Sequence, residues 1–141
     1  MDQRVSTVTC EVTAHVSVAK GSPVPLPAEL GYGITDPYAV RLSLGSSTCR
    51  PVTWFFARDL LSGGLGRATG RGDVRVIPGY GRRPGSLRVV LSNSAGTAVV
   101  ELAAREVAAF LRRTFTLVPA GTESVHLDID GAIAALIESR R

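Results

Sequence analysis

Arginine is the residue type whose number and spacing point most directly to chemistry in this chain. The sequence has fifteen arginines and one lysine, and six of the arginines lie between residues 64 and 90, where Asp73 is the one acid. These six are Arg67, Arg71, Arg75, Arg82, Arg83 and Arg88. A segment with this excess of positive charge attracts an anionic partner. A solvated rim of arginines has the same pattern, and the residues alone leave both interpretations open.

Histidine, cysteine and the acids do not combine into a catalytic or metal-binding motif. The two histidines, His15 and His126, lie outside any recognisable nucleophile motif, and two separated cysteines add no credible zinc site. The segment 126–131 spaces its oxygen ligands as a calcium loop does, but Ile137 stands where calcium needs a bidentate glutamate. We therefore expect no enzyme activity, no metal and no cofactor, and we interpret Asp128 as the N-cap of a helix.

The glycine-rich run 63–72 has two interpretations. Glycines at this density can form a loop that binds phosphate. Such loops follow a strand and precede a helix, whereas this run follows a predicted helix and precedes a predicted strand. It also has no lysine followed by serine or threonine. We interpret it as a connection that ends the helix at Gly63 and Gly64.

Aromatic side chains are densest at Trp54, Phe55 and Phe56. Aromatic residues on a sheet can stack with the bases of single-stranded nucleic acid. The segment 52–57 is nevertheless apolar on both of its faces, which is typical of a central strand covered on both sides. We therefore predict a central strand with Trp54 in the core.

Hydrophobic alternation predicts six strands that position these residues. The longest is 7–18, where apolar and polar residues alternate without a break. The three prolines of 21–27 lack N–H donors, so we expect the chain to leave the sheet there and to form a loop to about Pro37. The other strands are predicted at 38–44, 52–56, 73–77, 87–91 and 97–102, and helices at 57–65, 103–114 and 129–139.

The chain also resembles itself at a spacing of 47 residues. Aligned without a gap, the segments 37–61 and 84–108 share seven identities in 25 positions, against about two expected from average composition. Each segment is predicted to hold strand, strand and helix, with a further strand before it. This predicts an α+β domain of pseudo-twofold antiparallel β-sheets packed with helices. Asp59 and Glu106 fall in the first turn of the two helices, where they face the positive end of the helix dipole.

Length and composition fit one soluble domain. The chain has 141 residues, 45% of them hydrophobic and 20% charged, and we treat residues 1–141 as a single domain. It has no apolar run of about 18 residues and no apolar stretch before its first acid, so we expect neither a membrane span nor a secretory signal. We expect a cytoplasmic protein, in which Cys10 and Cys49 are small apolar residues rather than a disulfide.

Five motifs give the chain a specific resemblance to a known family. They are Asp36-Pro37-Tyr38-Ala39-Val40, Val52-Thr53-Trp54-Phe55-Phe56-Ala57-Arg58-Asp59-Leu60-Leu61 with Gly64-Leu65, Gly70-Arg71-Gly72-Asp73-Val74-Arg75-Val76-Ile77-Pro78, Phe110-Leu111-Arg112-Arg113-Thr114, and Val118-Pro119 with Gly121-Thr122-Glu123. In this order and spacing the chain resembles the actinomycete SsgA-like proteins, regulators of sporulation-specific cell division, over nearly its whole length. The preference for arginine over lysine suits a GC-rich actinomycete genome.

The resemblance implies a non-enzymatic role at the division septum. Members of the family act at the future septum, and the best understood kind recruits the tubulin-like division GTPase FtsZ and promotes assembly of its ring. FtsZ and other SsgA-like or division proteins are thus the implied partners. The resemblance also implies a homo-oligomer, with a trimer as the candidate, and a fold similar to the Whirly proteins, which bind single-stranded DNA. Single-stranded nucleic-acid binding is therefore the alternative function.

On this interpretation the candidate partner-binding residues are Arg67, Arg71, Arg82 and Arg83. We expect all four to be exposed in loops and to have no structural role. Base stacking needs basic and aromatic residues on one sheet face, whereas here the arginines lie in loops and the aromatics in an apolar strand. An acidic protein surface is therefore the expected partner, ahead of nucleic acid.

Overall fold

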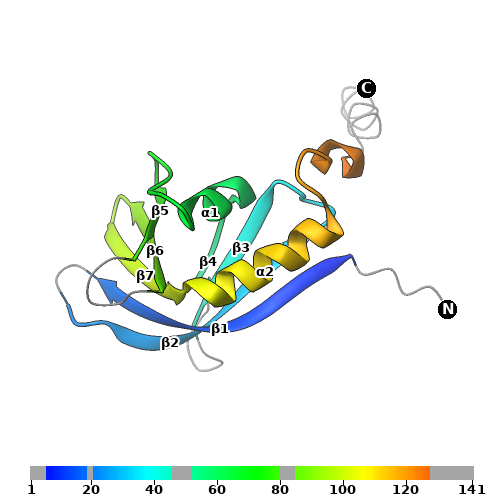
Figure 1. Ribbon diagram of the computed structural model, residues 1–141. Coiled ribbons are helices and arrows are strands. Elements are labelled where there is room, and N and C mark those ends of the chain that lie inside the picture. The colour runs from blue at the N-terminus through cyan, green and yellow to red at the C-terminus, as the bar shows by residue number, and fades with distance from the viewer. Residues whose placement is uncertain (1–5, 19–20, 46–51, 80–84, 128–141) are drawn as a thin grey trace, which may run out of the picture.

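The computed structural model describes residues 6–18, 21–45, 52–79 and 85–127 (Figure 1). The strands are β1 Thr7–Val18, β2 Val24–Gly33, β3 Ala39–Leu44, β4 Val52–Ala57, β5 Val74–Pro78, β6 Ser86–Asn93 and β7 Gly96–Ala103. The helices are α1 Arg58–Gly64, α2 Ala104–Leu117 and the short 3-10 helix η1 Glu123–His126. The six predicted strands and the first two predicted helices are confirmed. The predicted helix 129–139 and its cap Asp128 lie outside the described residues.

Hydrogen bonds join the seven strands of the described residues into one sheet, in the order β4-β3-β2-β1-β7-β6-β5. The long β1 connects the two halves, because it pairs with β2 from Thr7 to Val16 and with β7 from His15 to Val18. Every strand pair is antiparallel, and the structure is of the α+β class. The prediction of more than one sheet is therefore wrong for these residues, since β1 is long enough to pair with both neighbours.

A set of three strands and a helix occurs twice in the chain. The first set is β2, β3, β4 and α1, and the second is β5, β6, β7 and α2. Across the sheet the strands of the first set follow the order β4-β3-β2 and those of the second set the order β7-β6-β5. The equivalent strands β4 and β7, β3 and β6, and β2 and β5 run in the same direction. The two sets follow one another along the sheet, separated by β1, which is antiparallel to both of its neighbours.

The prediction that the chain leaves the sheet at 21–27 is wrong, because β2 begins at Val24 and pairs with β1 from there. The carbonyl of Pro27 accepts a hydrogen bond from the Gly45 N–H at 3.0 Å, so the backbone polar groups of Pro27 face β3 and not β1. The side to which the backbone N–H and C=O groups point alternates along a strand, so the backbone polar groups of Pro25 also face β3. Because β3 pairs with β2 only from Ala28 to Gly31, neither proline interrupts a ladder.

The prediction of a central strand at 52–57 is also wrong. β4 ends the sheet and pairs with β3 alone among the described strands. Phe56 is 7% exposed and lies in the core, Phe55 is 64% exposed, and Trp54 packs against the core while remaining partly exposed. Apolar residues occupy both faces of β4 as predicted, but one of those faces is uncovered.

Both helices contribute to a single core on one face of the sheet. α1 packs against β4 and β5, and α2 packs against β1 and β7 (Figure 1). The buried residues of α2 are Val107, Phe110, Leu111 and Thr114, which share one face at helical spacing. Asp59 and Glu106 lie in the first turns of α1 and α2, as predicted. Cys10 is a free thiol that packs partly buried against this core, and Cys49 lies outside the described residues.

A close contact between α1 and β5 explains one glycine of the connection after α1. A Cβ atom on Gly64 would lie 2.1 Å from Cγ1 of Val76, so a larger residue would push the helix off the strand. Within the part of the chain that the structure describes, every helix is too short to cross a membrane.

Candidate protein-interaction surface

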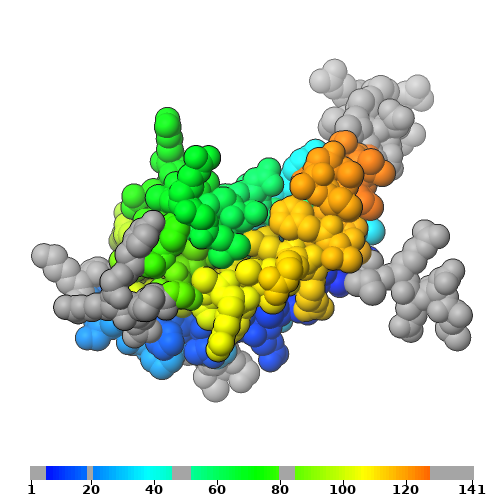
Figure 2. Space-filling view, viewed as in Figure 1, coloured from blue at the N-terminus to red at the C-terminus, as the bar shows by residue number. Residues whose placement is uncertain are grey.

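The loop between α1 and β5 presents two of the predicted partner-binding residues. Arg67 and Arg71 are both exposed, and neither makes an ion pair with another described residue. The loop, green in Figure 2, projects from the body of the molecule. Arg82 and Arg83 lie outside the described residues. The two described candidates therefore have the exposure that a docking surface requires.

Thr69 anchors this loop between the two arginines. Its N–H donates to the carbonyl of Val76 at 2.8 Å, and the Val76 N–H donates back to the carbonyl of Thr69 at 2.9 Å. The Thr69 hydroxyl donates to the carbonyl of Arg67 at 2.8 Å. Arg67 lies two residues before this anchored threonine and Arg71 two residues after it. The anchor limits the conformational entropy that the loop would lose on binding a partner.

Gly70 shows why the loop is rich in glycine. Its φ is +104°, a conformation that favours glycine, and a Cβ atom there would lie 2.6 Å from the carbonyl oxygen of Val74. The glycine therefore serves the turn into β5. This supports the interpretation of 63–72 as a connection, and α1 indeed ends at Gly64.

Two other arginines of the segment lie on strands. Arg75 is exposed on β5, the strand at the end of the sheet opposite β4. Arg88 on β6 lies 3.5 Å from the Glu101 carboxylate of β7, with Nε as its nearest atom. Arg88 is thus partly neutralised, and the unneutralised charge of the described segment lies at Arg67, Arg71 and Arg75.

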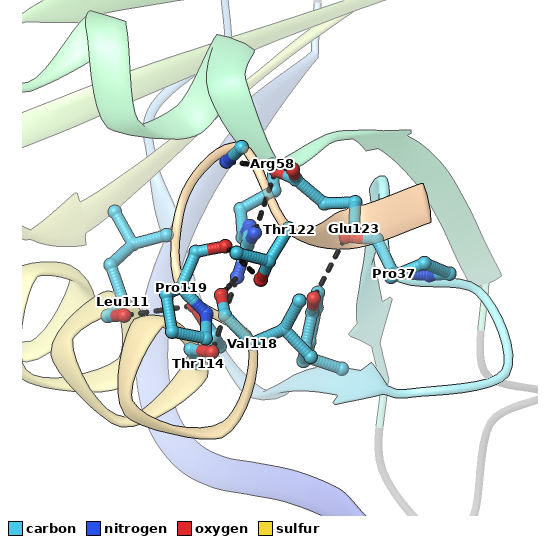
Figure 3. A network of polar contacts seen from close by, with 10 residues as sticks. Pro37, Arg58, Leu111, Thr114, Val118, Pro119, Thr122 and Glu123 are labelled. Atoms are coloured by element: carbon cyan, nitrogen blue, oxygen red, sulfur yellow. Dashed lines mark hydrogen bonds and ion pairs between the residues drawn. The ribbon is translucent and has the colours of Figure 1, made fainter. Parts of the chain in front are cut away.

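A buried arginine on α1 forms the densest polar network of the described residues (Figure 3). Arg58 is 1% exposed. Its Nη1 donates to the carbonyls of Thr114 at 3.1 Å and Val118 at 2.7 Å, and its Nη2 donates to Oε2 of Glu123 at 2.8 Å. The guanidinium also lies over the rings of Phe115, at 4.1 Å, and Tyr32, at 4.8 Å.

The groups around Arg58 are themselves held in place. The other carboxylate oxygen of Glu123 accepts the N–H of Gly121 at 2.8 Å, and the Tyr32 hydroxyl donates to the carbonyl of Pro37 at 2.8 Å. The hydrogen bond from Arg58 is the main cause that lowers the pKa of Glu123. Burial raises the pKa of Tyr32, against an opposing effect of the Arg58 charge. Glu123 is therefore held as a carboxylate and Tyr32 as a neutral phenol.

This network fixes how three elements meet and offers little to a ligand. Arg58 and Glu123 are both buried, and their hydrogen bonds go to each other and to nearby backbone. The network joins the start of α1 to the end of α2 and to η1. We did not single out Arg58 from the sequence as a functional residue. Its spacing of three and seven from Leu61 and Leu65 on a helical face is the signal that could have revealed its burial.

The sheet face away from the core is acidic where β1 and β2 pair. Glu11 and Glu29 lie directly opposite each other in the ladder, and Glu106 joins them at the edge of a hollow of about 670 Å³. Arg41 pairs with Glu29, and its guanidinium lies flat over Gly31, where a Cβ atom would be 2.5 Å from Nη2. In the part of the chain that the structure describes, no group of three or more histidine, cysteine or acidic residues is arranged to hold a metal ion.

An antiparallel sheet with two helices packed against one of its faces defines an α+β fold. Residues 26–123 match the family model described as "Streptomyces sporulation and cell division protein, SsgA". The chain therefore belongs to the SsgA family of sporulation and cell division proteins.

Curated relatives and solved structures agree with this assignment. The chain is 42% identical to the sporulation-specific cell division protein SsgB of Streptomyces coelicolor over 132 residues, 94% of this chain and 96% of that protein. It is 41% identical to SsgB of Thermobifida fusca over 134 residues, 95% of this chain and 97% of that protein.

The fold is similar to two solved structures of such relatives. One, from work on SsgB mutations that correlate to longitudinal cell division during sporulation of S. coelicolor, gives a TM-score of 0.80 at 42% identity and covers 89% of this chain and 99% of that chain. The other, an SsgA-like sporulation-specific cell division protein from T. fusca, gives 0.82 at 41% identity and covers 96% and 98%.

Proposed function

We propose that this protein is a non-enzymatic regulator of sporulation-specific cell division that acts by binding other division proteins. FtsZ is the proposed main partner, and other SsgA-like or division proteins are further ones. The proposed place of action is the cytoplasmic side of the division septum. The main support for this proposal is the loop that contains Arg67 and Arg71. This loop is anchored, exposed and basic, and it therefore suits an acidic protein surface.

The proposed role of the loop rests on the absence of acidic partners for Arg67 and Arg71 among the described residues. Arg58 and Arg88 have acidic partners within the fold, and Arg67 and Arg71 have none among the described residues. Exposed charges of this kind contribute little to the stability of a monomer. They do raise the rate at which a protein meets an oppositely charged partner. We include Arg82 and Arg83 in the proposed surface from the sequence.

Single-stranded nucleic-acid binding is the second candidate, and it rests on the resemblance to Whirly proteins. One structural observation favours it: exposed Phe55 lies opposite Arg41 on the same sheet face, the combination that base stacking uses. Glu11 and Glu29 lie on that face as well and would repel phosphates. We therefore prefer a protein partner.

Co-sedimentation of the purified protein with FtsZ polymers tests the proposed function. We expect the protein to enter the pellet only when FtsZ is polymerised. A parallel titration with single-stranded DNA at several salt concentrations separates the two candidates, because neutralising about four phosphates gives a slope of log affinity against log salt near −3. Tight DNA binding with this slope, and no protein in the FtsZ pellet, would replace the proposed function by the alternative.

We also propose that the protein self-associates, with a trimer as the candidate oligomer and a Whirly-like packing of its elements. The exposed apolar residues support this, since Val18, Val24, Val52 and Phe55 are each more than half exposed. Contiguous exposed apolar surface marks contact sites between proteins, and Val18 and Val52 line one apolar groove.

A further inference from the structure

A hollow lies on the sheet face away from the core, across strands β1 to β4. Its volume is about 460 Å³, which suits a small ligand or a single side chain. One row of directly paired residues crosses the sheet here, from β4 to β1: Phe55, Arg41, Gly31 and Thr9. Only the first two have large side chains, so an aromatic ring and a planar cation form a wall of the hollow.

The floor of the hollow is low because the neighbouring residues on the same face are small. Ala57 pairs with Ala39, and Gly33 pairs with Thr7. A Cβ atom on Gly33 would lie 3.6 Å from Cγ2 of Thr7 and 3.9 Å from Oγ1 of Thr35, which are ordinary contacts, and the φ of Gly33 lies outside the left-handed region. Packing and backbone conformation therefore allow a side chain at position 33. Its absence leaves the strand open to the close approach of another group.

Gly31 differs from Gly33, because Arg41 already fills the space above it. A Cβ atom on Gly31 would lie 2.5 Å from Nη2, 2.7 Å from Cζ and 3.0 Å from Nε of Arg41. One face of the guanidinium therefore rests on the backbone of Gly31, and the ion pair with Glu29 holds it there. The other face points outward, and the Arg41 side chain is 37% exposed. A guanidinium held flat in this way is ready to stack on an aromatic ring.

The acids around the hollow give it a negative potential. Asp36 lines the hollow in the turn after β2, is exposed, and forms no ion pair with another described residue. The next residue pair along this face is Glu11 with Glu29, and Arg41 neutralises one of these two acids. Such a site attracts a cation and repels a phosphate. The charges therefore favour a basic peptide over a nucleotide as the source of an aromatic ring.

We propose that this hollow binds an aromatic side chain of a partner protein, with a basic residue of the same segment next to Asp36. The ring lies on the small residues of the floor and against Arg41 and Phe55, where cation–π and aromatic contacts stabilise it. The inference goes beyond the function proposed above, because the hollow is separate from the arginine loop and attracts the opposite charge. A protein with both surfaces is able to hold an acidic and a basic partner at the same time.

NMR titration of the isotope-labelled full chain with an acetylated tryptophan-lysine dipeptide amide tests the inference. The backbone amide signals of Gly31, Gly33 and Asp36 should shift and saturate as the dipeptide is added. A leucine-lysine dipeptide lacks the ring and a tryptophan-glutamate dipeptide has the wrong charge, so each should bind at least about 3-fold more weakly.

Filling the floor of the hollow is the second test. Gly33→Val adds a side chain where the structure has room for one, and it should weaken dipeptide binding about 10-fold. Gly72→Val is the matched control, because a Cβ atom on Gly72 has no neighbour within 4 Å and Gly72 lies outside the hollow, so binding should not change. Phe55→Leu removes the aromatic wall without touching the floor and should weaken binding about 3-fold. Thermal unfolding checks that all three variants are folded.

The inference is overturned if the tryptophan-lysine dipeptide shifts none of these signals at about 10 mM, or if folded Gly33→Val and Phe55→Leu bind it as the wild type does. Thymidine monophosphate that shifts the same signals at lower concentration than the dipeptide would overturn it too, in favour of nucleic acid. Co-sedimentation of Gly33→Val with FtsZ polymers separates this inference from the proposed function, because recruitment through the arginine loop persists when only the hollow is filled.

Discussion

Arg58 supplies a positive charge that α2 lacks at its own C-terminal end. The last turn of α2 holds no basic residue, and its carbonyls carry the negative end of the helix dipole. The guanidinium of Arg58 reaches across from α1 to the carbonyls of Thr114 and Val118 and pairs with Glu123 (Figure 3). One side chain therefore completes a helix end and fixes the chain that follows it.

The first prediction concerns the removal of this side chain. Arg58→Ala should lower the free energy of unfolding by about 3–5 kcal/mol, because it leaves the Glu123 carboxylate buried without its cation. Urea unfolding at neutral pH measures the change. Arg105→Ala is the matched control: Arg105 occupies the equivalent position in the second helix but is exposed, and its loss should cost at most about 0.5 kcal/mol. Equal effects of the two substitutions would contradict the account.

Glu123 should make stability depend on pH in the acid range. Its pKa is lowered in the folded protein, so its contribution is complete above its ordinary pKa of about 4.3 and is lost as the pH falls toward the lowered folded value. Glu123→Gln should therefore be less stable than the wild type at pH 7, with a smaller difference at about pH 3. Urea unfolding at both pH values checks this. The same difference at both values, or an unchanged pH effect in the Arg58→Ala background, would contradict it.

At the scale of elements, neighbouring residues of β4 have opposite environments. Phe56 faces the core and Phe55 faces out, so Phe56→Ala should lower the free energy of unfolding by about 3–5 kcal/mol and Phe55→Ala by at most about 0.5 kcal/mol. The decrease for Trp54→Ala should lie between these two values, because Trp54 is partly exposed. If Trp54 were fully buried, its loss should cost as much as the loss of Phe56. Thermal unfolding of dilute protein measures all three. Similar melting temperatures for the two phenylalanine variants would show that the side chains do not alternate.

The periodicity of the sequence was enough to predict most helices and strands, but it could not predict the order of the strands in the sheet. The alternation of 7–18 and the helical face of 103–114 are local signals, and the structure has β1 and α2 there. Whether a strand is central or at an edge depends on its neighbours, so the apolar run of β4 could not reveal its position. The prolines of β2 are similar: their effect depends on which side of the strand the missing N–H faces.

At the scale of the molecule, one 12-residue strand decides how the two sets of elements combine. β1 has no counterpart in the repeat, and by pairing with β2 and β7 it makes a single sheet of both sets. The repeat itself was visible in the sequence because equivalent positions keep their residue types. The role of β1 was not, since pairing between distant segments leaves no local pattern.

The proposed partner-binding surface was also predictable only in part. The excess of arginine was readable from composition, and the structure places Arg67 and Arg71 on an exposed loop. The anchoring of that loop by Thr69 depends on contacts between segments and was not readable.

The association rate of the protein with FtsZ polymers tests the central claim most directly. A variant with Arg67, Arg71, Arg82 and Arg83 all replaced by alanine should fold as the wild type does and should associate about tenfold more slowly, with a smaller change in the dissociation rate. A control with Arg105, Arg112, Arg140 and Arg141 replaced by alanine has the same net charge and should associate nearly as the wild type does. An unchanged association rate in the first variant, or an equal decrease in both, would contradict the claim that these four arginines bind FtsZ.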